Sequence, residues 1–590
     1  MEIRLRRFPG MVVPSRTSPA SDRFGIPMRL SPRRSKQLPP SAIRAVAAST
    51  LGVFLVAIVS ATPRSPYYPV LPDGVEAQGP LRWIADLLGL QHLDDAGLML
   101  VGLIAVAAAA FGFILILRES WNRRISMRMV FVLAIAFHVL VLTLPLLFSR
   151  DVYSYAYYGR IASTYGANPY VLTPHDFPLN SLWHLTWPGW RDTPSVYGPL
   201  FTWVSVVMTG VVRSVDSTIR GFQVLAAFAS IGTMVIVARL VQRVRPERAV
   251  FAVAVIGLNP IVVFHVVGGG HNDMLVALFV AAAVSFLFAR RELASAMCLG
   301  LGMSVKASAV VPLILLLVAI AATVEPERRA RVLAKYTAVV GGIWLLLAAP
   351  YLQRTNPTLG LFELSGHDSG KAPGQLLVHA LTWVGTTLGG PAFETPATVV
   401  AHVLLFGLSV VGVWMIGRRI WQDPSARRPT AQAAAWGWAL LTVILLAPML
   451  GAWYLVWVLP LAWALPRVAR RTLVILCVAF TVTELVTENS RLPDLIRSVR
   501  LPFGHPIALI VCAWIAIDLI RRLMRKTPLD AETAEPQFGD AFEAGPASHP
   551  SEKPREPREP RLTVEPTAIL PSEGPRPGGS LIPLRFARRR

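Results

Sequence analysis

The stretch GLMLVGLIAVAAAAFGFILIL (residues 97–117) decides the fold class, because it is long, apolar and free of charged side chains. A helix needs about 20 apolar residues to cross the hydrocarbon core of a bilayer. The run MVFVLAIAFHVLVLTLPLLF (129–148) follows, and ASTLGVFLVAIVSA (48–61) precedes both. Only 16% of the residues are charged, against about 25% in soluble domains. The sequence therefore predicts an all-α, polytopic membrane protein.

The basic residues follow the membrane topology and do not form a nucleic-acid surface. The formal net charge is +22, but Lys and Arg concentrate in the two tails and in alternate short loops, as the positive-inside rule describes. A nucleic-acid binder clusters them on one face. We therefore expect the lipid bilayer as a partner and no nucleic acid. Cys298, Cys477 and Cys512 lie in apolar runs and predict no disulfide framework or metal site.

Three regions follow from composition. Residues 1–42 are rich in Arg, Pro and Ser, and residues 527–590 contain SEKPREPREPR, so both are predicted to be disordered cytoplasmic tails. Residues 43–526 form the membrane domain. Its first apolar run is interpreted as an uncleaved helix, because the basic region before it is too long for a signal peptide.

Alternation of the basic loops predicts about 14 crossings of the plasma membrane with both termini cytoplasmic. The short run YGPLFTWVSVVMTGVV (197–212) is predicted to be re-entrant or partly embedded, since a full crossing would place every later basic loop outside. The long loops then face outward, and their Trp, Tyr and Gly-Pro content predicts that they are ordered. We therefore expect an extracytoplasmic active site, with loops at 62–95, 149–198, 351–395 and 488–505.

The segment SRDVYSYAYYGR (149–160) begins where an apolar run ends. A carboxylate at the edge of a low-dielectric region is suited to proton abstraction, so Asp151 is the candidate general base. Arg150 and Arg160 are candidates to hold a phosphate by charge-assisted hydrogen bonds. The tyrosines of this segment are candidates to stack on sugar rings: Tyr153, Tyr155, Tyr157 and Tyr158. The alternatives are a helix cap for the charged residues and an interfacial aromatic belt for the tyrosines.

A second polar group, GGGHND (268–273), interrupts an apolar run. Polar side chains at membrane depth are functional candidates, so His271, Asn272 and Asp273 are predicted to bind substrate. Asp273 would be a second carboxylate, and His271 would bind phosphate or donate a proton. The alternative is a polar turn between helices with a glycine cap. No metal ligand is assigned and no cofactor is identified with certainty, and a divalent metal is an open alternative.

Three further features accompany these motifs. Lys306 interrupts the apolar run 294–318 and either neutralises a lipid phosphate or snorkels to the interface. The aromatic residues of AWYLVWVLP (452–460) are interpreted mainly as belt anchors. The basic residues of 484–505 are candidates to contact headgroups or an anionic donor: Arg491, Arg497 and Arg500.

Several short motifs in this order resemble a known family. They are SRDVYSY (149–155), NPY (168–170), YGPLFTW (197–203), NPIVVFHVVGGGHNDML (259–275), VKASAVVP (305–312) and AWYLVW (452–457). Together they look like the actinobacterial polyprenol-phosphate-mannose-dependent α-1,6-mannosyltransferases, which are integral membrane glycosyltransferases of the GT-C class. The similarity covers roughly residues 130–460. The pair Gly451-Ala452 departs from the more polar pair expected in close relatives.

The resemblance implies an inverting glycosyltransferase that moves a hexose, mannose above all, from a polyprenyl-phosphate donor to a cell-envelope glycan or lipoglycan. It also implies Asp151 as base, with His271, Asn272, Asp273 and Lys306 at the matching motif positions. No phosphate-binding or dinucleotide-binding glycine motif is evident, which suits a lipid-linked donor outside the cell. The alternatives are a polytopic transporter or lipid-linked sugar flippase, and a related enzyme for arabinose or glucose.

Overall fold

The structure is a computed structural model, and it describes residues 38–69, 79–353, 359, 373–447, 449–488 and 505–530. The chain divides into two units, Met1–Thr533 and Ala534–Arg590, and every described residue belongs to the first. Most of both predicted tails and parts of three predicted outer loops therefore lie outside the described residues. The basic residues predicted to contact headgroups lie there too: Arg491, Arg497 and Arg500.

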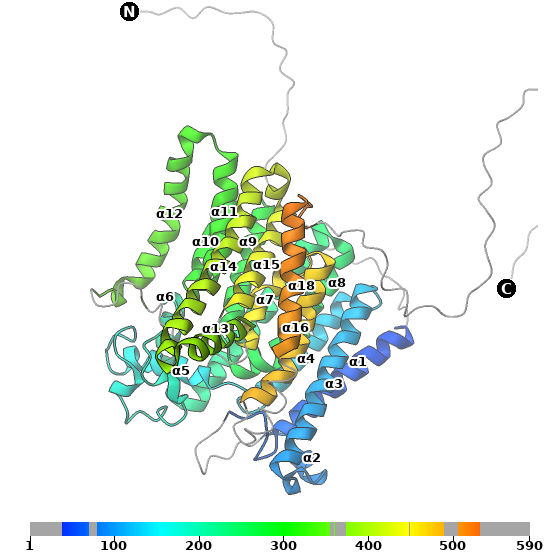
Figure 1. Ribbon diagram of the computed structural model, residues 1–590. Helices are drawn as coiled ribbons and strands as arrows, with labels where there is room; N and C mark the ends of the chain where they lie inside the picture. Colours follow the sequence, from blue (N-terminus) through cyan, green and yellow to red (C-terminus); the bar gives the residue numbers. More distant parts are fainter. Residues whose placement is uncertain are drawn as a thin grey trace, which may run out of the picture. The chain divides into compact units, whose positions relative to one another are not determined.

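The described part of the first unit is built from helices, as predicted, and no strand element occurs within it. Figure 1 shows the longer helices packed side by side as a bundle. In chain order they are α1 (Pro40–Ser60), α2 (Arg82–Leu87), α3 (Asp95–Trp121), α4 (Met127–Leu142), α5 (Asp151–Ser163), α6 (Pro199–Val211), α7 (Val215–Val244), α8 (Ala249–Gly257), the π-helix η5 (Ile261–Val267), α9 (Asp273–Phe288), α10 (Glu292–Met303), α11 (Val310–Thr323), α12 (Pro326–Ala348), α13 (Pro373–Gly389), α14 (Glu394–Gln422), α15 (Pro429–Leu446), the 3₁₀-helix η11 (Ala452–Trp457), α16 (Arg467–Glu488) and α18 (His505–Met524).

Seven helical segments among the described residues are long and apolar enough to cross a membrane. Six further apolar helices are shorter, with 10–17 residues each. Because helices shorter than about 17 residues do not reach across the hydrocarbon core unaided, the predicted 14 crossings stay a prediction. The seven segments are Pro40–Ser60, Asp95–Trp121, Val215–Val244, Pro246–Val267, Pro326–Tyr351, Pro391–Gln422 and Pro429–Leu446.

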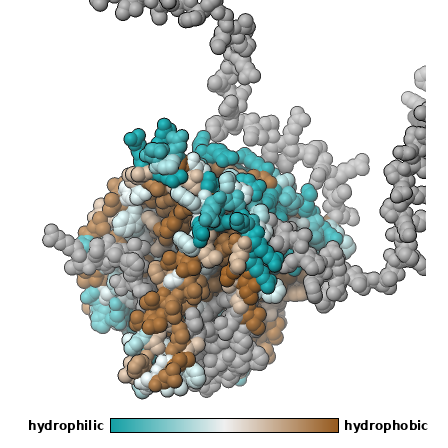
Figure 2. Space-filling view, turned by 45° about the horizontal axis from the view of Figure 1, so that its top comes forward, coloured by the Kyte–Doolittle hydropathy of each residue, from teal (hydrophilic) through white to brown (hydrophobic). Residues whose placement is uncertain are grey.

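Within the described residues, contacts occur between connections for which alternation of charge predicts the same side of the membrane. Two basic connections share one acidic partner, because Arg245 and Arg428 both pair with Asp530, at 3.8 and 3.9 Å. Figure 2 shows hydrophilic residues gathered at the end that is turned forward and hydrophobic residues along the sides. The predicted outer connections also meet, because the Asn168 side chain donates to the carbonyl of Tyr351 at 2.8 Å.

The apolar run 129–148 is helical only in part, which corrects the prediction of one span. Helix α4 ends at Leu142, and the chain then runs irregularly to Arg150. Pro145 explains the break, since proline has no backbone N–H and disfavours helical geometry in the residue before it. The irregular segment packs inward, where the Leu147 N–H donates to the carbonyl of Gly268 at 3.2 Å. This contact joins the two predicted polar motifs.

Helix α5 packs along the short helix α6 at a close crossing. A Cβ atom added at Gly159 would lie 2.4 Å from the backbone oxygen of Ser205. Only glycine therefore allows the two backbones to approach this closely. The crossing holds the helix that begins with Asp151 against the membrane domain.

We expect Gly159→Ala to destabilise the protein by about 1–3 kcal/mol, as overpacked core positions typically do. Thermal unfolding in detergent measures the effect. Gly210→Ala on α6 is the matched control, because its added Cβ would lie 4.0 Å from the nearest atom, in Ser163. Equal unfolding temperatures for the two variants would contradict the close crossing.

Candidate functional site

The first turn of α5 places Asp151 at the inner edge of a polar site. The Phe148 N–H donates to the carbonyl of Tyr67 at 2.7 Å, which holds the chain just before the helix. The backbone N–H of Asp151 then donates to Ser149 Oγ at 3.2 Å. The Asp151 side chain is 18% exposed, so its carboxylate is accessible without being fully solvated.

The glycine turn before α9 brings His271 to this carboxylate. Gly270 has a φ of +69°, a conformation that favours glycine, and the Gln223 side chain donates to the carbonyl of Gly268 at 2.6 Å. His271 Nδ1 lies 3.9 Å from Asp151 Oδ2. It also forms a hydrogen bond of 3.2 Å with the hydroxyl of Tyr155. Two motifs far apart in the sequence therefore form one cluster.

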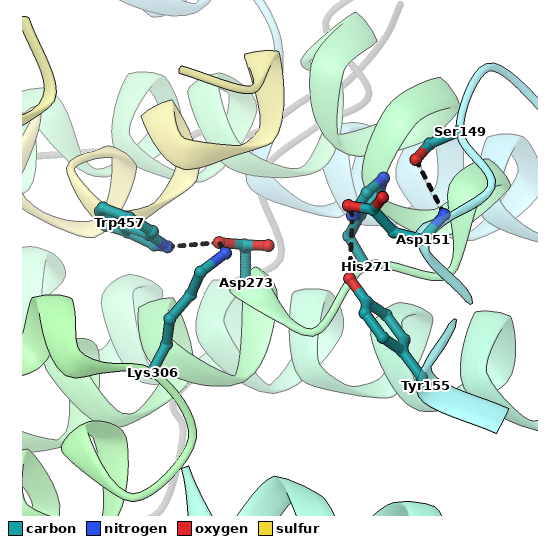
Figure 3. A network of polar contacts seen from close by, with 7 residues as sticks. All are labelled: Ser149, Asp151, Tyr155, His271, Asp273, Lys306 and Trp457. Carbon is teal, nitrogen blue, oxygen red and sulfur yellow. Dashed lines mark hydrogen bonds and ion pairs between the residues drawn. The ribbon is translucent and has the colours of Figure 1, made fainter. Parts of the chain in front are cut away.

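Asp273 and Lys306 form a second cluster beside the first (Figure 3). Lys306 Nζ lies 2.9 Å from Asp273 Oδ1, and Trp457 Nε1 donates to the same oxygen at 2.8 Å. Lys306 is 7% exposed, in the break between α10 and α11. It therefore points into the protein and does not snorkel to the interface. Asp273 is also the first residue of α9, where the helix dipole favours a negative charge.

The aromatic side chains of η11 pack against the two clusters. The ring of Trp453 stacks on His271 with 3.8 Å between centroids, and Lys306 Nζ lies 4.1 Å from the ring centroid of Tyr454. All three aromatic residues of η11 named here are buried, including Trp457. The interpretation of these residues as belt anchors is therefore wrong. They pack on polar groups inside the protein, and their side chains do not lie at a lipid interface.

The two clusters act on each other electrostatically. Both carboxylates act on the charge of Lys306, with the larger effect from Asp273 and a smaller one from Asp151. A carboxylate that is partly exposed and a lysine that is buried thus share one site. Its side chains come from α5, the turn before α9, the break before α11, and η11. This arrangement can accept a proton at one place and stabilise an anion at another.

Comparison with known proteins finds a matching family model. Residues 47–322 match the model described as alpha-(1->6)-mannopyranosyltransferase, N-terminal domain. Over this part of its length the chain is similar to the alpha-(1->6)-mannopyranosyltransferase family. The four charged or polar residues of the two clusters lie within it: Asp151, His271, Asp273 and Lys306.

Curated relatives carry the same family name. Alpha-(1->6)-mannopyranosyltransferase A of Mycobacterium tuberculosis is 27% identical over 350 residues, which cover 56% of this chain and 64% of that protein. Its counterpart in Corynebacterium glutamicum is 28% identical over 178 residues, or 29% of this chain and 36% of that protein. The matches thus span less than two thirds of these relatives. The resemblance to an actinobacterial mannosyltransferase family is confirmed.

The remaining tyrosines of α5 have structural partners. The Tyr157 hydroxyl donates to the carbonyl of Phe177 at 2.7 Å, and the Tyr158 hydroxyl donates to that of Thr193 at 2.8 Å. Burial raises the pKa of Tyr157 to about 12, so its hydroxyl keeps the proton that it donates. These two side chains fasten the loop 164–198 to α5, and their rings are not presented for sugar stacking.

Tyr153 and Arg150 lie next to Asp151 on the same helical turn. Burial and the negative charge of Asp216 raise the pKa of Tyr153 to about 12, although the positive charge of Arg150 opposes this rise. Tyr153 therefore stays protonated near neutral pH and can donate a hydrogen bond. Substrate binding by Tyr153, Tyr155 and Arg150 stays a prediction.

Arg160 is at the other end of α5 and is engaged with the loop. Its guanidinium donates to Asn180 Oδ1 at 3.1 Å, to Ser181 Oγ at 2.8 Å and to the carbonyl of Arg213 at 3.1 Å. These hydrogen bonds attach α5 to the loop 164–198 and to the segment between α6 and α7. Phosphate binding by Arg160 stays a prediction.

Asn272 lies in the glycine turn and is 3% exposed. Its amide nitrogen and oxygen are buried without a hydrogen-bond partner in the structure, which is costly unless another group satisfies them. Within the described residues, no group of three or more His, Cys, Asp or Glu side chains is placed to hold a metal ion.

Proposed function

We propose that the protein transfers mannose from a polyprenyl-phosphate donor to a cell-envelope glycan or lipoglycan on the outer face of the membrane. One observation carries the proposal: the partly exposed carboxylate of Asp151 shares a site with the buried cation of Lys306. Similarity to the alpha-(1->6)-mannopyranosyltransferase family supports the choice of sugar. The proposal includes a GT-C-like fold of about 14 crossings with both termini cytoplasmic.

The proposed reaction is a single displacement with inversion. Asp151 accepts the proton of the acceptor hydroxyl as the hydroxyl oxygen bonds to the anomeric carbon. The bond between that carbon and the phosphate oxygen breaks, and its electron pair leaves with the phosphate. Lys306 stabilises the charge that develops on this leaving group, and such stabilisation is usually the largest catalytic contribution. The hydroxyl of Tyr153 is available to orient the sugar.

Asp151 is a better base than Asp273 in this site. Asp273 is fully buried, and one of its oxygens already accepts from both Lys306 and Trp457. A carboxylate committed to a cation has less tendency to take a proton. Asp273 therefore positions Lys306, while Asp151 faces the acceptor.

Transfer and transport are distinguished with labelled donor. Purified protein in vesicles receives polyprenyl-phosphate [¹⁴C]mannose and a mannan acceptor. We expect label to appear in the acceptor glycan. A donor that only changes leaflet would support the alternative of a lipid-linked sugar flippase. The same assay with arabinose or glucose donors tests which sugar is used.

A further inference from the structure

An apolar groove of about 1060 Å³ lies between α11, α14 and the end of α15. These three helices contact one another, and Figure 1 shows them as neighbours in the bundle. Residues of α14 line the groove from His402 to Trp421. At 1.5 Å per residue this length is ~28 Å. The groove is therefore about as long as the hydrocarbon core of a bilayer is thick, ~30 Å.

One end of the groove opens at the site described above. Tyr454 lines the groove, and its ring also lies 4.1 Å from Lys306 Nζ. Val310 lines the groove as well, only one helical turn after Lys306 in the sequence. A molecule in the groove thus has one end within reach of the cation that is proposed to hold the leaving phosphate.

The wall formed by α14 leaves the groove accessible from the side. Phe406 is 71% exposed, Trp414 is 58% exposed and Val410 is 50% exposed, although all three line it. In a bilayer these surfaces face hydrocarbon. A long apolar chain can therefore enter laterally and need not leave the membrane.

We infer that this groove holds the polyprenyl chain of the donor, with its phosphate at Lys306. The inference rests on the proposed function. The groove has about the length of a membrane span, Lys306 lies at the end that meets the site, and Arg418 lines the groove near the C-terminal end of α14. A ligand with one long apolar tail and one anionic head fits with its head at Lys306. Lipid tails are as apolar as the groove walls, so selection depends on packing contacts and not on the hydrophobic effect. Side chains that fill the middle of the groove should therefore discriminate against long donors.

Two adjacent positions on α14 give a matched test. Val410 lines the groove and is 50% exposed, whereas Val411 is 49% exposed and does not line it. We expect Val410→Trp to reduce kcat/KM for a donor of ten or more isoprene units about tenfold, mainly through KM, because an overfilled site typically loses this much. The same variant should change kcat/KM for a two-isoprene mannosyl phosphate about twofold or less, since a short tail does not reach the indole.

Val411→Trp should leave both donors near wild-type values, which controls for the added bulk on α14. If both tryptophan variants treat long and short donors alike while the wild type transfers mannose, the groove is occupied by bilayer lipid and the inference is wrong. If the wild type transfers mannose from neither donor, the proposed function itself fails. Thermal unfolding of both variants in detergent identifies a misfolded protein.

Discussion

Asp151→Asn is expected to lower kcat for mannosyl transfer about 10²–10⁴-fold, the usual contribution of a general base. Asparagine has nearly the same shape as aspartate but cannot accept the proton of the acceptor hydroxyl. Because the side chain is 18% exposed and its contact with His271 Nδ1 is 3.9 Å, the substitution should disturb the fold little. The KM for the donor should therefore change much less than kcat. Single-turnover transfer from a radiolabelled donor in vesicles measures the loss.

An exposed aspartate in the loop 164–198 provides the control for Asp151. Asp192 is 76% exposed and lies 2.8 Å from the exposed imidazole of His175. Asp192→Asn should keep wild-type turnover, because an exposed charge contact contributes little. Wild-type turnover by Asp151→Asn would remove this residue from the role of base. Inactivity of both variants would point to a general effect on the loop and would equally contradict the assignment.

The separate motifs could be predicted from the sequence, but their mutual contacts could not. Asp151, His271, Asp273 and Lys306 each stood out as polar residues in apolar surroundings. Their meeting depends on Pro145, which ends α4 early and lets the segment before α5 reach the glycine turn. Hydropathy is high across this break, so it cannot distinguish the helical part from the irregular part.

Residue type alone predicts the wrong role for a side chain whose partner lies far along the chain. Trp453, Tyr454 and Trp457 have the composition of an interfacial belt, yet they are buried against His271 and Lys306. Tyr158 and Arg160 have side chains suited to sugar and phosphate, yet they bind loop groups far along the chain. Such partners are backbone carbonyls and amides, which leave no signal in a single sequence. The run of indoles next to a predicted polar site was the available clue for η11.

Single and double substitutions of Lys306 and Asp273 are expected to distinguish the contribution of this ion pair to stability from the contribution of the lysine to kcat. Lys306→Met leaves the Asp273 charge buried, and Asp273→Leu leaves the Lys306 charge buried. Removing one partner of a buried ion pair typically costs about 3–5 kcal/mol. Each single variant should therefore unfold at a clearly lower temperature and lose activity, so neither single variant alone reveals the role of the lysine.

The double variant Lys306→Met/Asp273→Leu is the decisive one. Replacing a whole buried pair by apolar side chains is often neutral for stability, so its unfolding temperature should return toward that of the wild type. Its kcat should stay about 10²–10³-fold low, because the cation that stabilises the leaving phosphate is absent. Recovered turnover in a recovered fold would show that Lys306 serves the structure only.

The pair Arg522 and Asp518 on α18 controls for the loss of an ion pair as such. Arg522 Nε lies 2.8 Å from Asp518 Oδ2, and the arginine side chain is 2% exposed. Arg522→Met/Asp518→Leu should keep kcat whatever it does to stability, since neither residue belongs to the site described above. If only the Lys306/Asp273 double variant loses kcat, the loss comes from the missing lysine charge and not from removal of an ion pair in general. Asp273 pairs with Lys306 and also accepts from Trp457. In the proposed mechanism an arriving phosphate would share the lysine cation while Trp457 continues to bind the carboxylate. In the proposed mechanism, a buried lysine that costs stability when unpaired thus lies where the leaving phosphate would form.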